Sequence, residues 1–151
     1  MTDVEIVLRF FAFRDREKLS GSVRSMLDGT MKRLRRPTAN ELVELRQDFM
    51  DALGICREVF EEHTFRLPPV GGRPGKISRP LYDAEMVAVF NLRSRRADLI
   101  AKREGIKGRI LEMSAPGSAT YDLMVGRGNT ATAISDRIDA VQQMLQEIID
   151  A

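Results

Sequence analysis

The sequence has only one cysteine, Cys56, and one histidine, His63. A single cysteine excludes a disulfide within the chain, which is typical of proteins from a reducing compartment. The two residues are also too few for a zinc site of the usual type, or for a hydrolase site built from two or more histidines. They lie on one predicted helix, about 10 Å apart by helical rise. We interpret them as a buried thiol and a helix-terminal imidazole, and we expect no metal and no cofactor.

Long apolar runs are also missing. The most apolar stretch, residues 3–14, carries Asp3, Glu5 and Arg9. At about twelve residues it is too short to cross a membrane. It has neither the basic leader nor the small-residue cleavage site of a secretory signal. We therefore expect a cytoplasmic protein with no membrane partner.

Neither sign of charge dominates the composition. The 24 basic and 22 acidic residues leave a net charge of +2, and the isoelectric point is near 8.9. This mild basic excess permits nucleic acid as a partner without requiring it. With 151 residues, of which 43% are hydrophobic, the chain is long enough for one globular domain with its own core. We expect a single domain over residues 1–151.

Apolar residues recur at three- and four-residue steps, and no segment shows the sustained alternation that indicates a strand. We predict an all-α fold, an irregular bundle of about six or seven helices. A flexible loop at 65–79, with three prolines and three glycines, interrupts it. Short helical pieces divided at Gly108, Pro116 and Gly117 fill residues 106–125. The clearer helices are predicted at 3–14, 22–34, from Thr38 after Pro37, at 78–92, at 94–105 and at 130–149.

The stretch 3–14 places apolar side chains on nearly every face of a helix, so this helix should be surrounded on several sides. Each large apolar side chain buried is worth about 1.5 to 3 kcal/mol. Thr2 and Glu5 stand at the spacing of a capping box, as do Thr38 and Glu41. The predicted apolar stripe of the second helix consists of Val23, Leu27, Met31 and Leu34.

Candidate catalytic groups are few. Carboxylates are numerous but scattered, and Asp136 with Asp139 is typical of the polar face of the last helix. The stretch GGRPGKIS at 71–78 departs from a phosphate-binding loop because Val70 replaces the first glycine and Ile77 replaces Ser or Thr. We interpret it as a turn. We assign no catalytic residue and do not expect this chain alone to be an enzyme.

Basic residues provide the candidate phosphate contacts. Lys32, Arg33, Arg35 and Arg36 end a predicted helix, where the dipole favours cations. Capping alone explains Asn129 and Thr130, although the amide groups of VGRGNT at 125–130 also favour an anion. Solvated surface and nucleic-acid or phosphate binding both stay open for the candidate set, which consists of Arg95, Arg96, Lys102, Arg103, Arg127 and Asn129.

Three stretches resemble one family. They are DVEIVLRFFAFRD at 3–15, GSVRSMLDGTMKRL at 21–34 with ELVELRQDFMDALGICREVFEEHTFRL at 41–67, and RGNTATAISDRI at 127–138. Their order resembles the helical C-terminal half of GmrSD-type restriction proteins, a domain-of-unknown-function family with a ParB and sulfiredoxin-like N-terminal domain. The matching positions are Asp3, Glu5, Leu8, Arg9, Phe10, Phe65, Arg66, Asn129, Arg137 and Ile138.

The resemblance implies that other domains of the family carry the catalytic functions. In the family, an N-terminal domain with an Asp-Gly-Gln-Gln-Arg signature is associated with nucleotide binding and hydrolysis, and a His-Asn-His nuclease domain completes such systems. This sequence has neither, since its adjacent glutamines, Gln142 and Gln143, are followed by Met144. The resemblance therefore implies a non-catalytic module that packs against a ParB-like catalytic domain or subunit in bacterial restriction and anti-phage defence.

Two further hypotheses stay open. The chain is alternatively an independent nucleic-acid-binding module, with DNA as its partner, or an autonomous nucleotide hydrolase. The apolar helix at 3–14 would also permit a homo-oligomer through that helix.

Overall fold

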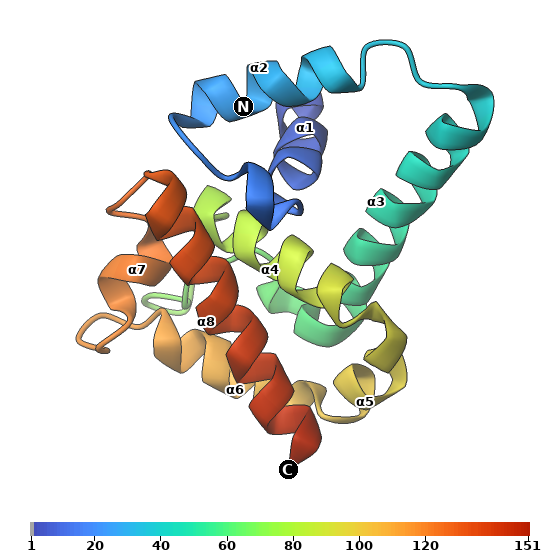
Figure 1. The fold of residues 1–151 in the computed structure, drawn as a ribbon. Helices are drawn as coiled ribbons and strands as arrows, with labels where there is room; N and C mark the ends of the chain where they lie inside the picture. The colour runs from blue at the N-terminus through green and yellow to red at the C-terminus, as the bar shows by residue number, and fades with distance from the viewer. Residues whose placement is uncertain (1) are drawn as a thin grey trace.

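Helices make up most of the chain in the computed structural model, which describes residues 2–151 (Figure 1). No strand is present in this range, so the predicted all-α fold is confirmed, with eight α-helices instead of six or seven. None of the helices described is both long and apolar enough to cross a membrane. The helices are α1 Asp3–Phe13, α2 Val23–Arg33, α3 Ala39–Phe60, α4 Arg79–Asn91, α5 Arg96–Ala101, α6 Arg103–Met113, α7 Tyr121–Val125 and α8 Ala131–Asp150. Single 3-10 turns lie at Arg16–Lys18, Glu61–His63 and Arg93–Arg95.

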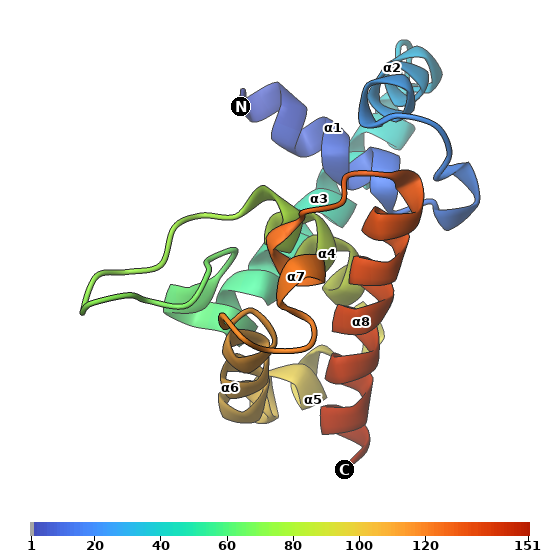
Figure 2. The same ribbon diagram turned by 90° about the vertical axis from the view of Figure 1, so that its left-hand side faces the viewer.

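Helix α4 is the enclosed element of the bundle. Its most extensive contact is with α8, and α3, α1 and α7 also pack against it (Figures 1 and 2). Every residue from Leu81 to Val89 is buried, including two carboxylates. The fold is therefore organised around α4, and the charged groups of this helix have to find partners inside the protein.

The prediction that the first helix is surrounded on several sides is only partly right: α2, α4 and the turn at Arg16–Lys18 contact it, but its first half is not enclosed. Helix α1 lies at the edge of the bundle, where Phe10 and Phe13 are buried but Val4 is 71% and Val7 38% exposed. The buried part packs through the ring of Phe10, which meets Phe49 of α3 and Phe90 of α4 edge-on at centroid distances of 5.8 and 5.4 Å. Val4 and Val7 stay exposed because no element of the described chain covers this face of α1.

The predicted helix starts agree with the structure. The side-chain oxygens of Ser22, Ser78 and Thr130 accept hydrogen bonds from the backbone of the helices that follow. Thr38 and Glu41 form a reciprocal capping box at the start of α3. These contacts are local, which is why short sequence patterns predict them.

The capping box predicted at Thr2 is only half formed. The backbone N–H of Glu5 donates to Thr2 Oγ1 at 3.2 Å. The Glu5 carboxylate instead lies 3.7 Å from Arg9 and 3.8 Å from Arg79. The Glu5 carboxylate therefore lies near Arg9 and Arg79 and does not complete the capping box.

The stripe predicted on the second helix is also wrong in part. Met26 and Thr30 are the buried residues of α2, whereas Met31 is 56% exposed. Helix α2 packs against α1. The contact with α1 therefore decides which face of α2 is buried, and the number of apolar residues on each face does not.

Two boundaries in the middle of the chain differ from the prediction. The helix predicted at 94–105 breaks at Lys102, and α6 then continues through both Gly105 and Gly108. A glycine inside a helix costs about 1 kcal/mol, less than the burial of Ile106 and Ile110 contributes at about 1.5 to 3 kcal/mol each. Tertiary packing thus outweighs the local helix breakers.

The helix predicted to carry both Cys56 and His63 ends too early for that. Helix α3 stops at Phe60, and Glu61 adopts a φ of 48°. His63 consequently lies in the following 3-10 turn, where its Nε2 is 3.2 Å from Glu62. The two side chains do not share a helix face.

Residues 65–78 form no helix, as expected, and fold back on themselves as a hairpin, whereas Arg79 already belongs to α4 (Figure 2). Isolated bridges join Arg66 to Ile77 and Val70 to Arg73. Glycine is required at position 75, where the returning arm of the hairpin approaches the first arm. A Cβ there would lie 1.6 Å from the carbonyl oxygen of Leu67. The flexibility of this segment stays a prediction.

Candidate functional site

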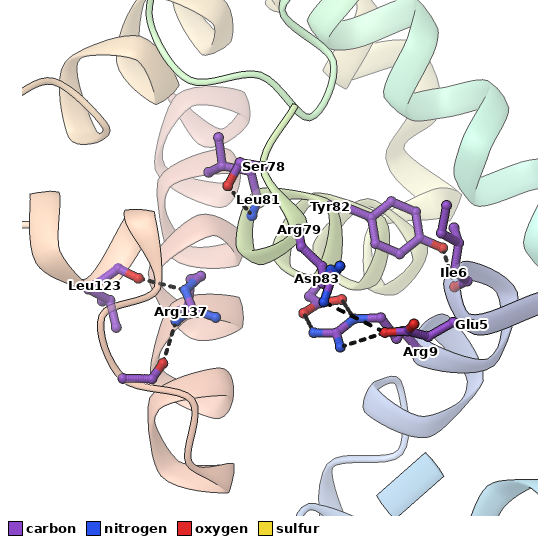
Figure 3. Close-up of polar contacts among 11 residues, drawn as sticks. Glu5, Ile6, Arg9, Ser78, Arg79, Leu81, Tyr82, Asp83, Leu123 and Arg137 are labelled. Carbon is purple, nitrogen blue, oxygen red and sulfur yellow. Dashed lines mark hydrogen bonds and ion pairs between the residues drawn. The ribbon is translucent and has the colours of Figure 1, made fainter. Parts of the chain in front are cut away.

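A buried ion pair between α1 and α4 is the most enclosed of the ion pairs among the described residues (Figure 3). Arg9 donates from Nε to Asp83 Oδ1 at 2.8 Å and from Nη2 to Asp83 Oδ2. The two side chains are only 5% and 2% exposed. This two-bond geometry ties residues 74 positions apart in the sequence and satisfies both carboxylate oxygens.

Arg137 of α8 adds a second buried cation beside this pair. Its Nε donates to the carbonyl of Leu123 at 2.6 Å and its Nη2 donates to the carbonyl of Gly128 at 3.0 Å (Figure 3). Burial lowers the pKa of Arg137 and raises the pKa of Asp83, although Arg9 acts against the latter shift. Arg137 therefore fixes the loop between α7 and α8 through backbone carbonyls, while Asp83 serves Arg9.

Tyr82 extends the cluster to α1 and to the hairpin. Its hydroxyl donates to the carbonyl of Ile6 at 2.7 Å. The ring of Phe65 packs edge-on against it with centroids 5.0 Å apart. Several positions of the family resemblance thus meet around α4, namely Glu5, Arg9, Phe65 and Arg137.

Two positions of the resemblance lie elsewhere. Asp3 is exposed in the first turn of α1. Arg66 holds the hairpin, where its Nη1 donates to the carbonyl of Gly75 at 2.8 Å. The described contacts of Arg9, Arg66 and Arg137 thus join segments of the fold to one another.

Two carboxylates of α4, Asp83 and Glu85, were missed by the sequence reasoning. Glu85 accepts a hydrogen bond from the backbone N–H of Phe65 at 2.9 Å, but its Oε1 has no partner within the described protein. Burial raises the pKa of Glu85 well above its ordinary value. The available signal was two acidic residues within the otherwise apolar stretch LYDAEMVAVF at 81–90.

Cys56 lies near this carboxylate without forming a reactive pair. Its Sγ is 3.9 Å from the sulfur of Met86, and burial together with Glu85 raises the pKa of the thiol well above its ordinary value. Nucleophilic chemistry needs the thiolate. The predicted buried thiol is confirmed, and its surroundings hold it in the neutral form.

Most of the predicted phosphate-binding cations are already engaged by carboxylates. Arg95 lies 2.5 Å from Asp98 and 2.9 Å from Asp150. Arg96 pairs with Glu58 at 2.7 Å and lowers the pKa of that carboxyl, and Arg103 lies 3.5 Å from Glu61. Lys102 alone of these four has no ion pair in the part of the chain that the structure covers.

The other two candidate residues lie far from this group. Arg127 and Asn129 precede α8, whereas Arg95 contacts Asp150 at its end, and a helix of 20 residues is about 30 Å long. Arg127 turns back onto Asp122 at 3.1 Å. The candidate set therefore does not form one surface, and capping by Thr130 accounts for the start of α8.

An apolar groove of about 560 Å³ lies between α1 and the first half of α3, closed at one end by the α2–α3 connection. We call it the α1–α3 groove. Helix α1 contributes Val4, Val7, Leu8 and Phe11 to it. Helix α3 contributes Leu42, Leu45, Phe49 and Met50. The groove is lined by most of the exposed apolar side chains of the two helices, although Val43 of α3, which is 68% exposed, lies outside it.

Within residues 2–151, no three His, Cys, Asp or Glu side chains lie close enough together to hold a metal ion. Asp83 is paired with Arg9, and Oε1 of Glu85 is buried without a hydrogen-bond partner. The α1–α3 groove is an accessible apolar surface, and the Arg9–Asp83 pair holds α1, one of its walls, against α4.

Comparisons with protein-family models, with curated proteins and with solved structures give no match.

Proposed function

We propose that this chain is a non-catalytic helical module that packs against a ParB-like, nucleotide-hydrolysing domain or subunit of a cytoplasmic restriction and anti-phage defence system. The observation that carries the proposal is the uncovered apolar α1–α3 groove. Contiguous apolar surface of this kind marks an interaction site in a folded domain. The nature of the partner comes from the family resemblance of the sequence.

Exposure along the two walls supports an interface of this kind. Val4 is 71%, Leu42 58% and Met50 52% exposed, although each lies on a well-formed helix. Scattered exposed apolar residues need no explanation. Residues on two facing helices that line the same groove do, because a partner would remove all of them from water together.

The buried charges support a structural role for the module. Arg9 and Asp83 connect α1 to α4, and Arg137 connects α8 to α7 and to the loop between them. Each of these charged side chains forms hydrogen bonds within the fold. We therefore assign none of them to acid or base catalysis. The chemistry of the complex would come from the partner domain.

The nucleic-acid alternative has less support. Three of its four α5-region cations are paired with carboxylates, and such pairs reduce the attraction for phosphate. The alternative still makes a clear forecast of gel retardation of duplex DNA at low salt, with affinity that falls steeply as salt increases. Retardation lost on Lys102→Glu would favour it over the module hypothesis.

The main test is direct association with a ParB-like domain of the GmrSD type from the same genome. Gel filtration and isothermal titration calorimetry should show a one-to-one complex with a Kd at or below about 10 µM. An unrelated acidic protein of similar size serves as the control for charge-driven association. Absence of heat and of co-elution at about 100 µM of each protein would overturn the proposal.

A further inference from the structure

The hairpin of residues 65–78 carries charge of one sign only. Residues 64–82 contain no Asp or Glu, although the chain as a whole has 22 acidic residues. The basic residues inside the hairpin are Arg66, Arg73 and Lys76. One more, Arg79, follows at the start of α4 and lies 3.8 Å from Glu5. A segment of this kind attracts anions, because no carboxylate within it neutralises its cations.

The cations of the hairpin are not used in ion pairs. Arg73 and Lys76 lie on its second arm, where both are exposed, and neither pairs with a carboxylate of any described residue. Arg66 donates to the carbonyl of Gly75, a neutral group, so its charge is not cancelled either. The hairpin differs in this respect from the α5 region, whose arginines are paired.

Carboxylates close to the hairpin are mostly engaged elsewhere. Glu61 pairs with two cations of α6. Glu85 is fully buried and accepts a hydrogen bond from the backbone N–H of Phe65. Glu62 is exposed and lies 3.2 Å from His63, in the turn that precedes the hairpin. This one carboxylate at the base does not cancel the charge of the three cations beyond it.

The hairpin is narrow and stands away from the helices (Figure 2). The two bridges place residues 66–70 opposite residues 73–77. Arms of this length reach roughly 15 Å at about 3.3 Å per residue. Gly71 and Gly72 form the tip, with φ of 58° and 73°, the positive values of a tight two-residue turn. A Cβ built at either glycine would meet no atom within 4 Å, so the described protein leaves the tip uncovered.

The base of the hairpin is fixed to α4. The backbone N–H of Ser78 donates to the carbonyl of Phe65 at 2.7 Å, which closes the hairpin at its base. The Phe65 ring packs against Tyr82, and its backbone N–H donates to Glu85 at 2.9 Å. The hairpin is therefore presented in one direction, which reduces the ordering cost of binding.

The shape and charge of the hairpin match the major groove of duplex DNA. This groove is about 12 Å wide and about 8.5 Å deep, and it admits a two-stranded ribbon, whose strands lie about 4.8 Å apart. Phosphates border the groove on both sides. Cations without carboxylates among them gain from contact with such a polyanion.

Other nucleic acids fit the hairpin less well. The major groove of double-stranded RNA is deep and narrow, so a ribbon of this width does not enter it. Single strands are bound largely by stacking of their bases on aromatic rings. Phe65 is the one aromatic residue of the hairpin, and its ring packs against Tyr82.

We propose that the hairpin of residues 65–78 enters the major groove of duplex DNA and contacts the phosphates through Arg66, Arg73 and Lys76. Contacts to phosphate carry no sequence information by themselves, so the binding is independent of base sequence. This surface is separate from the α5-region cations. The inference goes beyond the proposed function and does not depend on the ParB-like partner.

The first test measures binding of the full chain to a fluorescent DNA duplex of about 20 base pairs, roughly two helical turns. Fluorescence anisotropy should give a Kd between about 1 and 100 µM, the range of sequence-independent binding. The logarithm of the association constant should fall with the logarithm of the salt concentration with a slope of about −2 to −3, since each phosphate contact contributes about −0.9. No binding at about 100 µM protein and about 50 mM salt would overturn the inference.

Matched variants locate the contact. Arg73→Gln and Lys76→Gln should each bring the salt slope closer to zero by about 1, and together they should weaken binding at least about tenfold at about 50 mM salt. The control is Arg35→Gln with Lys102→Gln, which removes the same charge from two exposed and unpaired positions elsewhere. It should leave the slope unchanged. Circular dichroism of each variant confirms that the fold is retained. An equal loss in the control, or wild-type binding by the hairpin variant, would overturn the inference.

Other ligands give distinct results. Double-stranded RNA or single-stranded DNA that binds at least as tightly as the duplex would contradict entry into the major groove. Sedimentation with vesicles of phosphatidylserine and phosphatidylcholine, lost in the hairpin variant and without DNA binding, would identify a membrane surface and overturn the inference.

The proposed function is tested separately. If the ParB-like domain forms its complex and the duplex is not bound, this inference fails and the proposed function stands. If the duplex is bound through the hairpin and no complex forms, the reverse holds.

Discussion

The α1–α4 contact and the α1–α3 groove use the same helix in opposite ways. On one side of α1, Arg9 is buried against Asp83. On the other side, Val4 and Val7 are exposed although they are apolar. A charged side chain is therefore buried and apolar side chains are exposed, on different faces of a single helix of 11 residues.

The difference lies in which groups have found partners. Arg9 and Asp83 satisfy each other through two hydrogen bonds, so the cost of removing both from water is largely offset. The apolar residues of the groove have no covering element in the described chain. We conclude that the face of α1 towards the bundle is covered by other elements, whereas its face towards the groove is not.

The largest effect is expected from breaking the buried pair on one side only. Asp83→Leu leaves Arg9 buried without its carboxylate and should lower the free energy of unfolding by about 3 to 5 kcal/mol. The double variant Arg9→Met with Asp83→Leu removes both charges and should recover most of that loss. Urea denaturation monitored by circular dichroism measures both values.

An exposed ion pair provides the control for this experiment. Arg96 and Glu58 are 48% and 43% exposed, and Glu58→Leu should cost no more than about 1 kcal/mol. A loss at Asp83 as small as that at Glu58, or a double variant no more stable than the single one, would contradict the contrast between the two regions.

A smaller, pH-dependent effect is expected from Glu85. Burial raises the pKa of this carboxyl in the folded state above its ordinary value of 4.5. The folded protein then holds a proton that the unfolded chain releases, so the contribution of Glu85 to stability is complete below about pH 4.5 and is lost as the pH rises through the folded-state pKa. Glu85→Gln, which mimics the protonated form, should match the wild type near pH 4 and exceed it at pH 7, by about 1.4 kcal/mol for each unit by which the folded-state pKa is raised.

The matched control is Glu44→Gln at an exposed position of α3. Its effect on the free energy of unfolding should stay within about 0.5 kcal/mol at every pH. Thermal and urea unfolding between pH 4 and pH 7 would test the pair. A pH-independent difference between Glu85→Gln and the wild type would show that Glu85 is not protonated in the folded state.

The smallest effect on stability is expected in the groove. Leu42 is 58% exposed, so Leu42→Asp should change the free energy of unfolding of the isolated chain by no more than about 0.5 kcal/mol. Leu81→Ala in the buried helix α4 should instead cost about 2 to 5 kcal/mol. Comparison of the two unfolding midpoints gives the contrast, and a large loss at Leu42 would mean that the groove residue supports the bundle after all.

Most of the fold could be predicted because its helices begin with local signals. Thr38 with Glu41, and Ser78 before Pro80, act within a few residues of each other. The breaks around Lys102 and the continuity through Gly108 could not be predicted in the same way. They depend on which apolar residues the rest of the bundle covers.

The candidate site was predicted only in fragments. Arg9 and Arg137 were singled out by the resemblance, but Asp83, which pairs with the first and lies near the second, was missed. Its partner is 74 residues away in the sequence. The cations Arg95 and Arg96, in contrast, were singled out although the structure pairs them with distant carboxylates.

The sequence by itself determined the all-α class, the helix starts at Thr38, Ser78 and Thr130, and the lack of a disulfide, because these follow from composition and from contacts between near neighbours in the chain. Only the tertiary structure decided which charges are paired and which apolar faces are covered. Burial and ion pairing depend on residues brought together from distant parts of the chain, and for that reason α4 became the enclosed helix while the outer face of α1 remained open.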